Sequence, residues 1–98
     1  HVLVIPKEHY KDLLTMPNDL LSDISKTTKK VAKAVMKATG ADGINLGQNN
    51  CKAAGQAVFH FHIHVIPRFD DDGLKHWPHK SYEDGEMDKL AEDIKSII

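Results

Sequence analysis

The sequence contains a single cysteine, Cys51, so it can form no internal disulfide, and it has no C-x-x-C pair to hold a structural zinc ion. An unpaired thiol is typical of a reducing compartment, and we expect the protein in the cytoplasm. Long hydrophobic runs are absent too, since none approaches the roughly 18–20 residues needed to cross a bilayer. The sequence therefore predicts a soluble protein with no membrane partner.

An excess of charge of either sign is also missing. Thirteen basic and fourteen acidic residues give a formal net charge of −1, so no strong field attracts nucleic acid, and we expect no nucleic-acid partner. The length predicts one domain over residues 1–98. Because the chain starts at a histidine and runs directly into the apolar stretch V-L-V-I-P, we expect that residues upstream are missing.

The pattern of apolar residues predicts an α+β fold. Segments that are β-branched or alternate in polarity predict three strands, at residues 1–5, 43–50 and 58–68. The short glycine-containing loop between the last two of these favours an antiparallel sheet.

Helical spacing of apolar residues predicts a long amphipathic helix at 18–39 with a lysine-rich solvent face, and a C-terminal helix at 86–98. Asn18 fits the N-cap of the long helix, and Gly40 fits the residue that ends it. A short helical turn is expected within residues 7–16.

Histidines occupy every second position in the stretch H-F-H-I-H-V-I, residues 60–66. Side chains of a strand alternate between its faces, so His60, His62 and His64 are expected on one face, while apolar neighbours on the other face meet the core. Three imidazoles are costly to bury without partners. The histidine face must therefore meet solvent or a ligand.

Three hypotheses account for this row. It is an exposed polar surface, a metal site, or a site for an anion. Neutral imidazole suits zinc or copper, but the nearby Asn49, Asn50 and Gln56 are weak ligands.

The hypothesis of an anion site accounts for more residues than the other two hypotheses. An imidazole whose Nδ1–H is bonded to a carbonyl presents an unprotonated Nε2 as a nucleophile. The A-G-Q loop before the strand offers backbone N–H groups, and Asn49 and Gln56 add amide donors. This combination favours phosphoryl or nucleotidyl transfer.

Two motifs then resemble one family. G-Q-A-V-F-H-F-H-I-H-V-I-P-R, residues 55–68, resembles the histidine triad (HIT) superfamily pattern His-φ-His-φ-His-φ-φ, which follows a G-Q-[ST] turn. H-V-L-V-I-P-K-x-H, residues 1–9, is similar to the family segment G-H-x-L-V-I-P-K-x-H. The resemblance covers essentially the whole chain and implies a HIT-like fold, with an antiparallel sheet, one long amphipathic helix and a C-terminal helix.

The resemblance implies four catalytic residues. His62 matches the nucleophile that forms a nucleotidyl-histidine at an α-phosphate, and His64 matches the residue that contacts phosphate oxygens. His60 matches the residue whose carbonyl orients the nucleophile and whose ring contacts a fourth histidine, assigned to His1.

The resemblance also implies a set of substrate-binding residues. Two of them are triad histidines, and the others supply backbone and amide groups from the part of the chain before the triad. These residues are Asn49, Gly55, Gln56, Ala57, His62 and His64. No metal is required for this chemistry, and we expect no cofactor and no structural zinc.

Within the superfamily, histidine at position 64 differs from the galactose phosphate uridylyltransferase branch, which carries glutamine there. The chain looks most like the Hint-type branch, which implies hydrolysis of purine nucleoside phosphoramidates by a homodimer that joins its sheets. Hydrolysis of dinucleoside polyphosphates is the close alternative. A purine-nucleotide-binding protein with little turnover and a metal-binding module also remain open.

The chain departs from the family pattern at three points. Ala57 stands where serine or threonine is usual, and Cys51 stands where glycine is frequent. The family's N-terminal segment, with further strands, a zinc half-site and a ribose-binding acid, has no counterpart in this sequence, which implies an incomplete nucleoside pocket.

Two further groups of residues have weaker assignments. The H-W-P-H loop, with His76, Trp77 and His79, either packs on its own tryptophan or reaches a site across a dimer. His9 is expected to face solvent.

Overall fold

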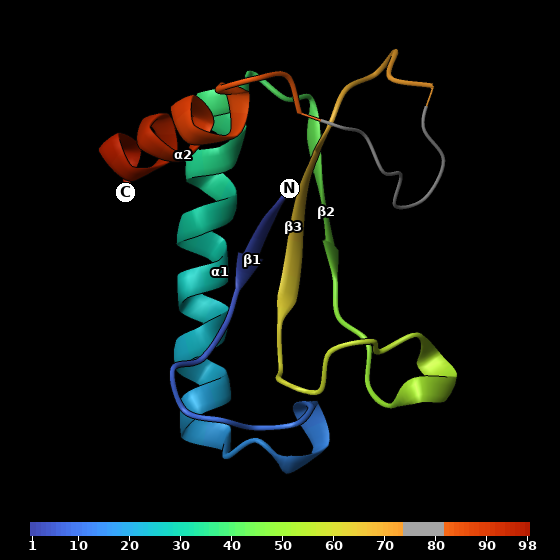
Figure 1. The fold of residues 1–98 in the computed structure, drawn as a ribbon. Helices are drawn as coiled ribbons and strands as arrows, with labels where there is room; N and C mark the ends of the chain where they lie inside the picture. The colour runs from blue at the N-terminus through green and yellow to red at the C-terminus, as the bar shows by residue number, and fades with distance from the viewer. Residues whose placement is uncertain (74–81) are drawn as a thin grey trace.

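The computed structural model describes residues 1–73 and 82–98 and has a three-stranded antiparallel sheet with two helices. The strands are β1 (Val2–Val4), β2 (Gly43–Gly47) and β3 (Ile63–Arg68), in the spatial order β1-β3-β2. Figure 1 shows the long helix α1 (Asn18–Thr39) along one face of this sheet, and α2 (Glu86–Ile97) across the C-terminal end of α1. The expected α+β fold is confirmed.

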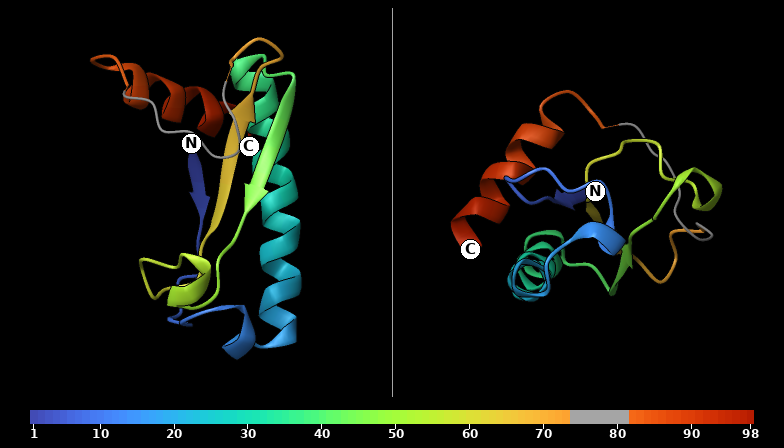
Figure 2. Two further views of the ribbon diagram at one scale, coloured as in Figure 1. Left: turned by 90° about the vertical axis from the view of Figure 1, so that its right-hand side faces the viewer. Right: turned by 90° about the horizontal axis from the view of Figure 1, so that it is seen from below.

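The register of the sheet places the two sequence motifs, residues 1–9 and 55–68, side by side. Leu3 of β1 pairs with His64 of β3, and Gly47 of β2 pairs with the same histidine from the other side. Both pairings are antiparallel, and for β2 and β3 this arrangement was predicted from the loop between them. Figure 2 shows β3 lying between its two neighbours. The first residues of the chain are therefore held beside the triad.

The hydrophobic core lies between α1 and the sheet. Phe61, Val35 and Val65 are the largest fully buried side chains, and Phe61 and Val65 come from the apolar positions that alternate with the histidines. Ile24 of α1 and Ile94 of α2 also belong to this cluster. Burial of side chains this size contributes roughly 1.5–3 kcal/mol each, so the core fixes which face of β3 is turned away from α1.

The helix α1 has the predicted range, but its N-terminal cap differs from the prediction. Asn18 is already helical, and Pro17 takes the capping position with an extended backbone and no side-chain capping bond. The Pro17 carbonyl accepts the first helical bond from Leu21 N–H over 3.0 Å, so the helix starts without an Asn18 side-chain cap. Gly40 ends the helix at φ 67°, a conformation that glycine adopts without steric cost.

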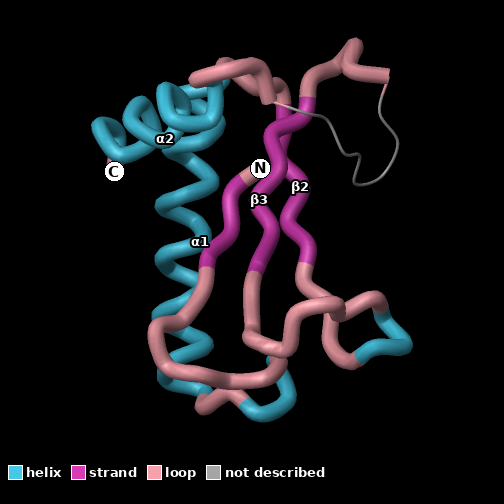
Figure 3. The backbone as a smooth tube through the Cα atoms, in the orientation of Figure 1, coloured by secondary structure: helices cyan, strands magenta, loops and turns pink. Residues whose placement is uncertain are grey.

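The predicted turn at residues 7–16 shrinks to a single turn of 3-10 helix, η1 (Leu13–Thr15). Asp12 begins it by accepting a hydrogen bond from Thr15 N–H. A second short turn, η2 (Lys52–Ala54), interrupts the loop between β2 and β3. Figure 3 shows these loops at the end of the sheet where β3 begins. In the described part of the chain, no helix is long and apolar enough to span a bilayer.

Candidate active site

The third strand is shorter than predicted, and this changes how the triad is held. We expected a strand over 58–68, but β3 begins at Ile63. Residues 58–60 bend, and the N–H of Phe61 donates to the carbonyl of Tyr10 over 2.7 Å instead of joining the sheet ladder. The prediction was wrong because the apolar alternation continues through residues that pair with a distant loop. Of the triad, only His64 lies within the strand.

His62 has a defined hydrogen bond. Its Nδ1 lies 2.7 Å from the carbonyl oxygen of His60. A carbonyl can only accept, so His62 Nδ1 carries the proton and, in the neutral ring, Nε2 keeps its lone pair. The side chain is half-buried. The arrangement thus presents an oriented basic nitrogen at the protein surface, as a nucleophile requires.

His64 lies beside His62 and is held from the other side by His1. The two triad rings meet edge to face with centroids 4.9 Å apart. His1 Nε2 lies 2.7 Å from His64 Nδ1. When His1 donates in this bond, His64 carries its own proton on Nε2 and can donate it to an anion.

The pKa of His64 is lowered from its ordinary value, mainly because burial disfavours the imidazolium and secondly because His62 repels it. Both effects disfavour a charge on His64 when no anion is bound. A phosphate oxygen close to this ring would act in the opposite direction, since a nearby negative charge favours the protonated form.

The ring of His60 does not take the contact that we expected. Its Nε2 donates to the carbonyl of Pro6 over 2.9 Å, and its Nδ1 lies 3.0 Å from Nδ1 of His9. The fourth histidine in contact with His60 is therefore His9, and His1 lies against His64. The assignment of this role to His1 was wrong because the segment of residues 6–10 lies against His60, while His1 reaches His64 in β3.

His9 was missed as a site residue. It is exposed, as expected, but its ring lies against that of His60 with centroids 5.1 Å apart. The sequence held one signal for it, because the P-K-x-H segment that resembles the family ends at this histidine. Nothing in the spacing alone connects residue 9 to residue 60.

The loop before the triad is shaped by two residues with positive φ. Cys51 has φ 71° and Gly55 has φ 91°. A Cβ built on Gly55 would lie 3.4 Å from Asn49 Nδ2, so the glycine backbone lies close to this amide. Asn49 and Gly55 are thus brought together as the sequence predicted, while Ala57 is exposed beyond them.

Gln56 has a different role from the one expected for its side chain. It is buried, and its Oε1 accepts from the N–H of Cys51 over 2.7 Å. Its Nε2 donates to the carbonyls of Lys11 and Val58. The prediction of an amide donor for an anion was wrong for this side chain, because its hydrogen bonds tie the loop together.

The metal hypothesis gains no support from the described residues. Across 1–73 and 82–98, no three His, Cys, Asp or Glu side chains are grouped so that they could hold a metal ion. The absence of a required cofactor stays a prediction. The alternative roles of His76, Trp77 and His79 concern residues outside the described ranges.

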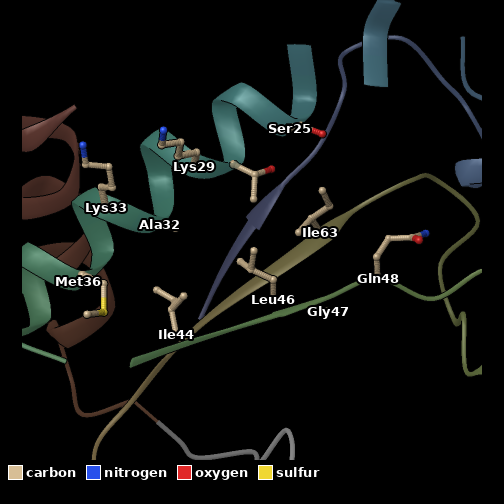
Figure 4. A pocket seen from close by; sticks show the side chains of 11 residues that line it. Ser25, Lys29, Ala32, Lys33, Met36, Ile44, Leu46, Gly47, Gln48 and Ile63 are labelled. Atoms are coloured by element: carbon tan, nitrogen blue, oxygen red, sulfur yellow. The ribbon is translucent and has the colours of Figure 1, made fainter. Parts of the chain in front are cut away.

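A groove lies on the other side of the sheet from His64. It encloses about 580 Å³ between α1 and β2, and Figure 4 shows Ile44, Leu46 and Ile63 on its sheet side and Ala32 and Met36 on its helix side. The groove is therefore separate from the histidine site.

Comparison with known proteins identifies the family. Residues 1–71 match the HIT domain, and the chain belongs to this family. It is 39% identical over 104 residues to adenosine 5'-monophosphoramidase HNT1 of Candida albicans, covering 100% of this chain and 68% of the relative. It is also 39% identical over 100 residues to adenylylsulfatase HINT3 of Arabidopsis thaliana, covering 100% of this chain but only 50% of that protein.

The fold agrees with this assignment. The crystal structure of a HIT-like protein from Bartonella henselae superposes with a TM-score of 0.85 at 36% identity, over 98% of this chain and 69% of the other. The chain thus spans between half and about two thirds of the lengths of these three proteins.

Proposed function

We propose that this protein hydrolyses a nucleoside 5'-phosphoramidate, with a purine nucleoside preferred, through a nucleotidyl-histidine intermediate on His62. The observation that carries the proposal is the 2.7 Å hydrogen bond from His62 Nδ1–H to the carbonyl of His60. In the neutral ring, it leaves Nε2 unprotonated and fixes the direction of the Nε2 lone pair.

The reaction proceeds by two displacements at phosphorus. In the first, His62 Nε2 forms a bond to the α-phosphorus while the bond from phosphorus to the leaving amine breaks, and the amine takes up a proton. In the second, water attacks the same phosphorus, the bond to Nε2 breaks, and a nucleoside monophosphate and a proton are released. Such chemistry asks the protein chiefly for positioning and for stabilisation of charge on the phosphoryl oxygens.

The neighbouring residues fit those two tasks. His64 lies 4.9 Å from His62 between ring centroids and is positioned to donate to a non-bridging oxygen. The Asn49 amide, which lies beside the backbone at Gly55, is proposed as a further donor to the phosphate. His1 holds the ring of His64 by the bond between their nitrogens. Each group acts on the phosphate or on a residue that touches it.

The choice of a phosphoramidate is supported by the name of the Candida relative, a monophosphoramidase. The name of the Arabidopsis relative, an adenylylsulfatase, describes a different leaving group on an adenylyl unit. Dinucleoside polyphosphate hydrolysis uses the same attack at an α-phosphorus and is the second candidate. All three differ only in what leaves.

The test measures release of adenosine monophosphate from adenosine phosphoramidate and from diadenosine polyphosphate, each with and without a chelator. We expect chelator-resistant release from the phosphoramidate that His62→Ala abolishes, and a transient nucleotidyl adduct on the wild-type protein by intact mass. Lys26→Ala, an exposed residue on α1, serves as the matched control. Nucleotide binding with no release from either substrate would replace the hydrolase with a nucleotide-binding protein.

We further propose a homodimer in which two copies meet through β2 and its groove. β2 is an edge strand of the described sheet, and Leu46 on it is 54% exposed although it lines an apolar groove. Burial of such surface in a second copy is favourable. Light scattering after gel filtration tests this, and we expect Leu46→Glu to give monomers where Lys26→Ala does not. A monomeric wild type at high concentration would remove the proposal.

A cytoplasmic location is part of the same proposal. Its support is the exposed thiol of Cys51, which has no second cysteine in this sequence to pair with. Fractionation of cells that express a tagged protein would test it.

A further inference from the structure

His60 is fixed by partners that come from one short segment of the chain, Pro6–Tyr10. The Pro6 carbonyl accepts from His60 Nε2–H over 2.9 Å, and the His9 ring bonds to His60 Nδ1 over 3.0 Å. The Tyr10 carbonyl accepts from the N–H of the next residue, Phe61. Figure 3 shows the loop that follows β1 running past the start of β3.

The protonation states follow from these partners. Because the Pro6 carbonyl only accepts, His60 Nε2 carries a proton, and neutral His60 has a lone pair on Nδ1. His9 must then donate from its own Nδ1. If His60 takes up a second proton, the bond survives only when His9 reverses its role and accepts. The two facing nitrogens share one proton in either case, and the bond is lost when both rings are charged.

The position of His60 matters because its carbonyl holds the nucleophile. This carbonyl lies outside the sheet ladder, since β3 begins only at Ile63. Its direction therefore depends on the anchors of residues 60 and 61 rather than on strand pairing. His62 Nδ1–H follows the carbonyl, at 2.7 Å, and the direction of the His62 Nε2 lone pair follows in turn.

We infer that His9 is a positioning residue for the nucleophile: its imidazole fixes the ring of His60, and through the His60 carbonyl it fixes the tautomer and orientation of His62. This inference rests on the proposed function for its kinetic part, but the tautomer of His62 is a property of the free protein. The two can therefore fail separately.

The experiment compares wild type with His9→Ala and His9→Asn. In His9→Ala, kcat for phosphoramidate hydrolysis is expected to fall about tenfold to a hundredfold with little change in KM, because a misplaced nucleophile affects the chemical step. In His9→Asn, the amide nitrogen occupies the place of Nδ1 and can donate to His60, so most of the loss is recovered. Lys7→Ala, an exposed neighbour in the same segment, is the control and keeps wild-type kcat.

Nitrogen NMR of the histidine rings provides the second readout. Wild type is expected to show His62 protonated on Nδ1, His9→Ala a mixture of tautomers, and His9→Asn the wild-type pattern. A His9→Ala protein that folds and keeps both kcat and the His62 tautomer overturns the inference. If wild type shows no hydrolysis, the tautomer pattern still decides the role of His9, and only the proposed function is lost. If His9→Ala does not fold, His9→Asn is compared with His9→Gln, whose longer side chain misplaces the donor. The inference is overturned if both variants show the same loss of kcat and the same disturbed tautomer of His62.

Discussion

The imidazoles of His1 and His64 lie nitrogen to nitrogen, with Nε2 of the first 2.7 Å from Nδ1 of the second. This contact joins the first residue of the chain to the strand that carries the triad. It places a hydrogen-bonded histidine next to His62, whose ring is 4.9 Å away between centroids. The charge state of His64 is therefore set by its surroundings.

The first prediction concerns this charge state. The pKa of His64 is lowered from its ordinary value of 6.5, first by burial and then by repulsion from His62. An NMR titration should give a midpoint below 6.5, and His62→Gln should move it upward. A midpoint above 6.5 in the free protein would contradict the assignment.

The lowered pKa of His64 also makes the stability of the folded protein depend on pH. At pH values between the lowered pKa and 6.5, the unfolded chain binds the proton more readily than the folded one. The contribution of His64 to the free energy of unfolding is therefore complete above pH 6.5. It is lost as the pH falls through the pKa that His64 has in the folded protein. We expect the acid-induced decrease in melting temperature to be smaller in His64→Gln than in wild type.

Cys51 provides a prediction about backbone strain. Its φ of 71° and ψ of 160° lie in a region that only glycine populates readily. Cys51→Gly should raise the free energy of unfolding by about 1 kcal/mol, since relief of strain of roughly 1–3 kcal/mol is partly offset by the greater freedom of glycine in the unfolded chain. Urea denaturation measures the change. Cys51→Ala removes the same thiol but keeps the strain, so equal stabilities for the two variants would rule out the strain argument.

Gln56 tests how the loop before the triad is held. Its buried amide makes three hydrogen bonds to backbone groups of Cys51, Lys11 and Val58. Gln56→Ala leaves these groups without that partner and should cost about 2–3 kcal/mol of the free energy of unfolding. Lys52→Ala, an exposed residue of the same loop, should change it by less than about 0.5 kcal/mol. A Gln56→Ala protein as stable as wild type would show that the loop does not depend on this side chain.

Ala57 gives a prediction for activity. A hydroxyl at this exposed position, usual in the family pattern, adds a donor for the phosphate or the leaving group. Ala57→Ser should raise kcat for phosphoramidate hydrolysis by about tenfold or more, given the rate lost when such donors are removed. Ala53→Ser in the same loop controls for a general effect of serine. Equal rates for Ala57→Ser and wild type would assign position 57 no part in the chemical step.

The range of α1 could be predicted from the sequence because its determinants are local. Apolar residues at helical spacing lie on the buried face, and Gly40 takes the left-handed conformation that ends the helix. The limits of the helix depend on neighbours in the chain, which the sequence displays directly. The antiparallel pairing of β2 with β3 was also predicted correctly, but the connection between them, residues 48–62, is longer than the predicted loop.

The errors at the candidate site concern contacts between distant segments. Phe61 looked like part of a strand, but its N–H bonds to a carbonyl far away in the sequence, that of Tyr10. The contact between His9 and His60 spans 51 positions, and periodicity carries no information about it. The Gln56 side chain turned inward for the same reason, since its partner Lys11 lies 45 positions away. The sequence could indicate which residues form the candidate site, but not which of them hold the others.

The edge strand β1 has a consequence for how this protein loses function. It is only three residues long, and it leads into both His1 at one end and the Pro6–Tyr10 segment at the other. Short edge elements open at a lower free energy than the whole domain. Local detachment of β1 would release His1 and the Pro6–Tyr10 segment from the triad histidines, and it would also remove Val4 from the core. We therefore expect the proposed hydrolase activity to be lost on heating at or below the melting temperature of the domain, as β1 frays.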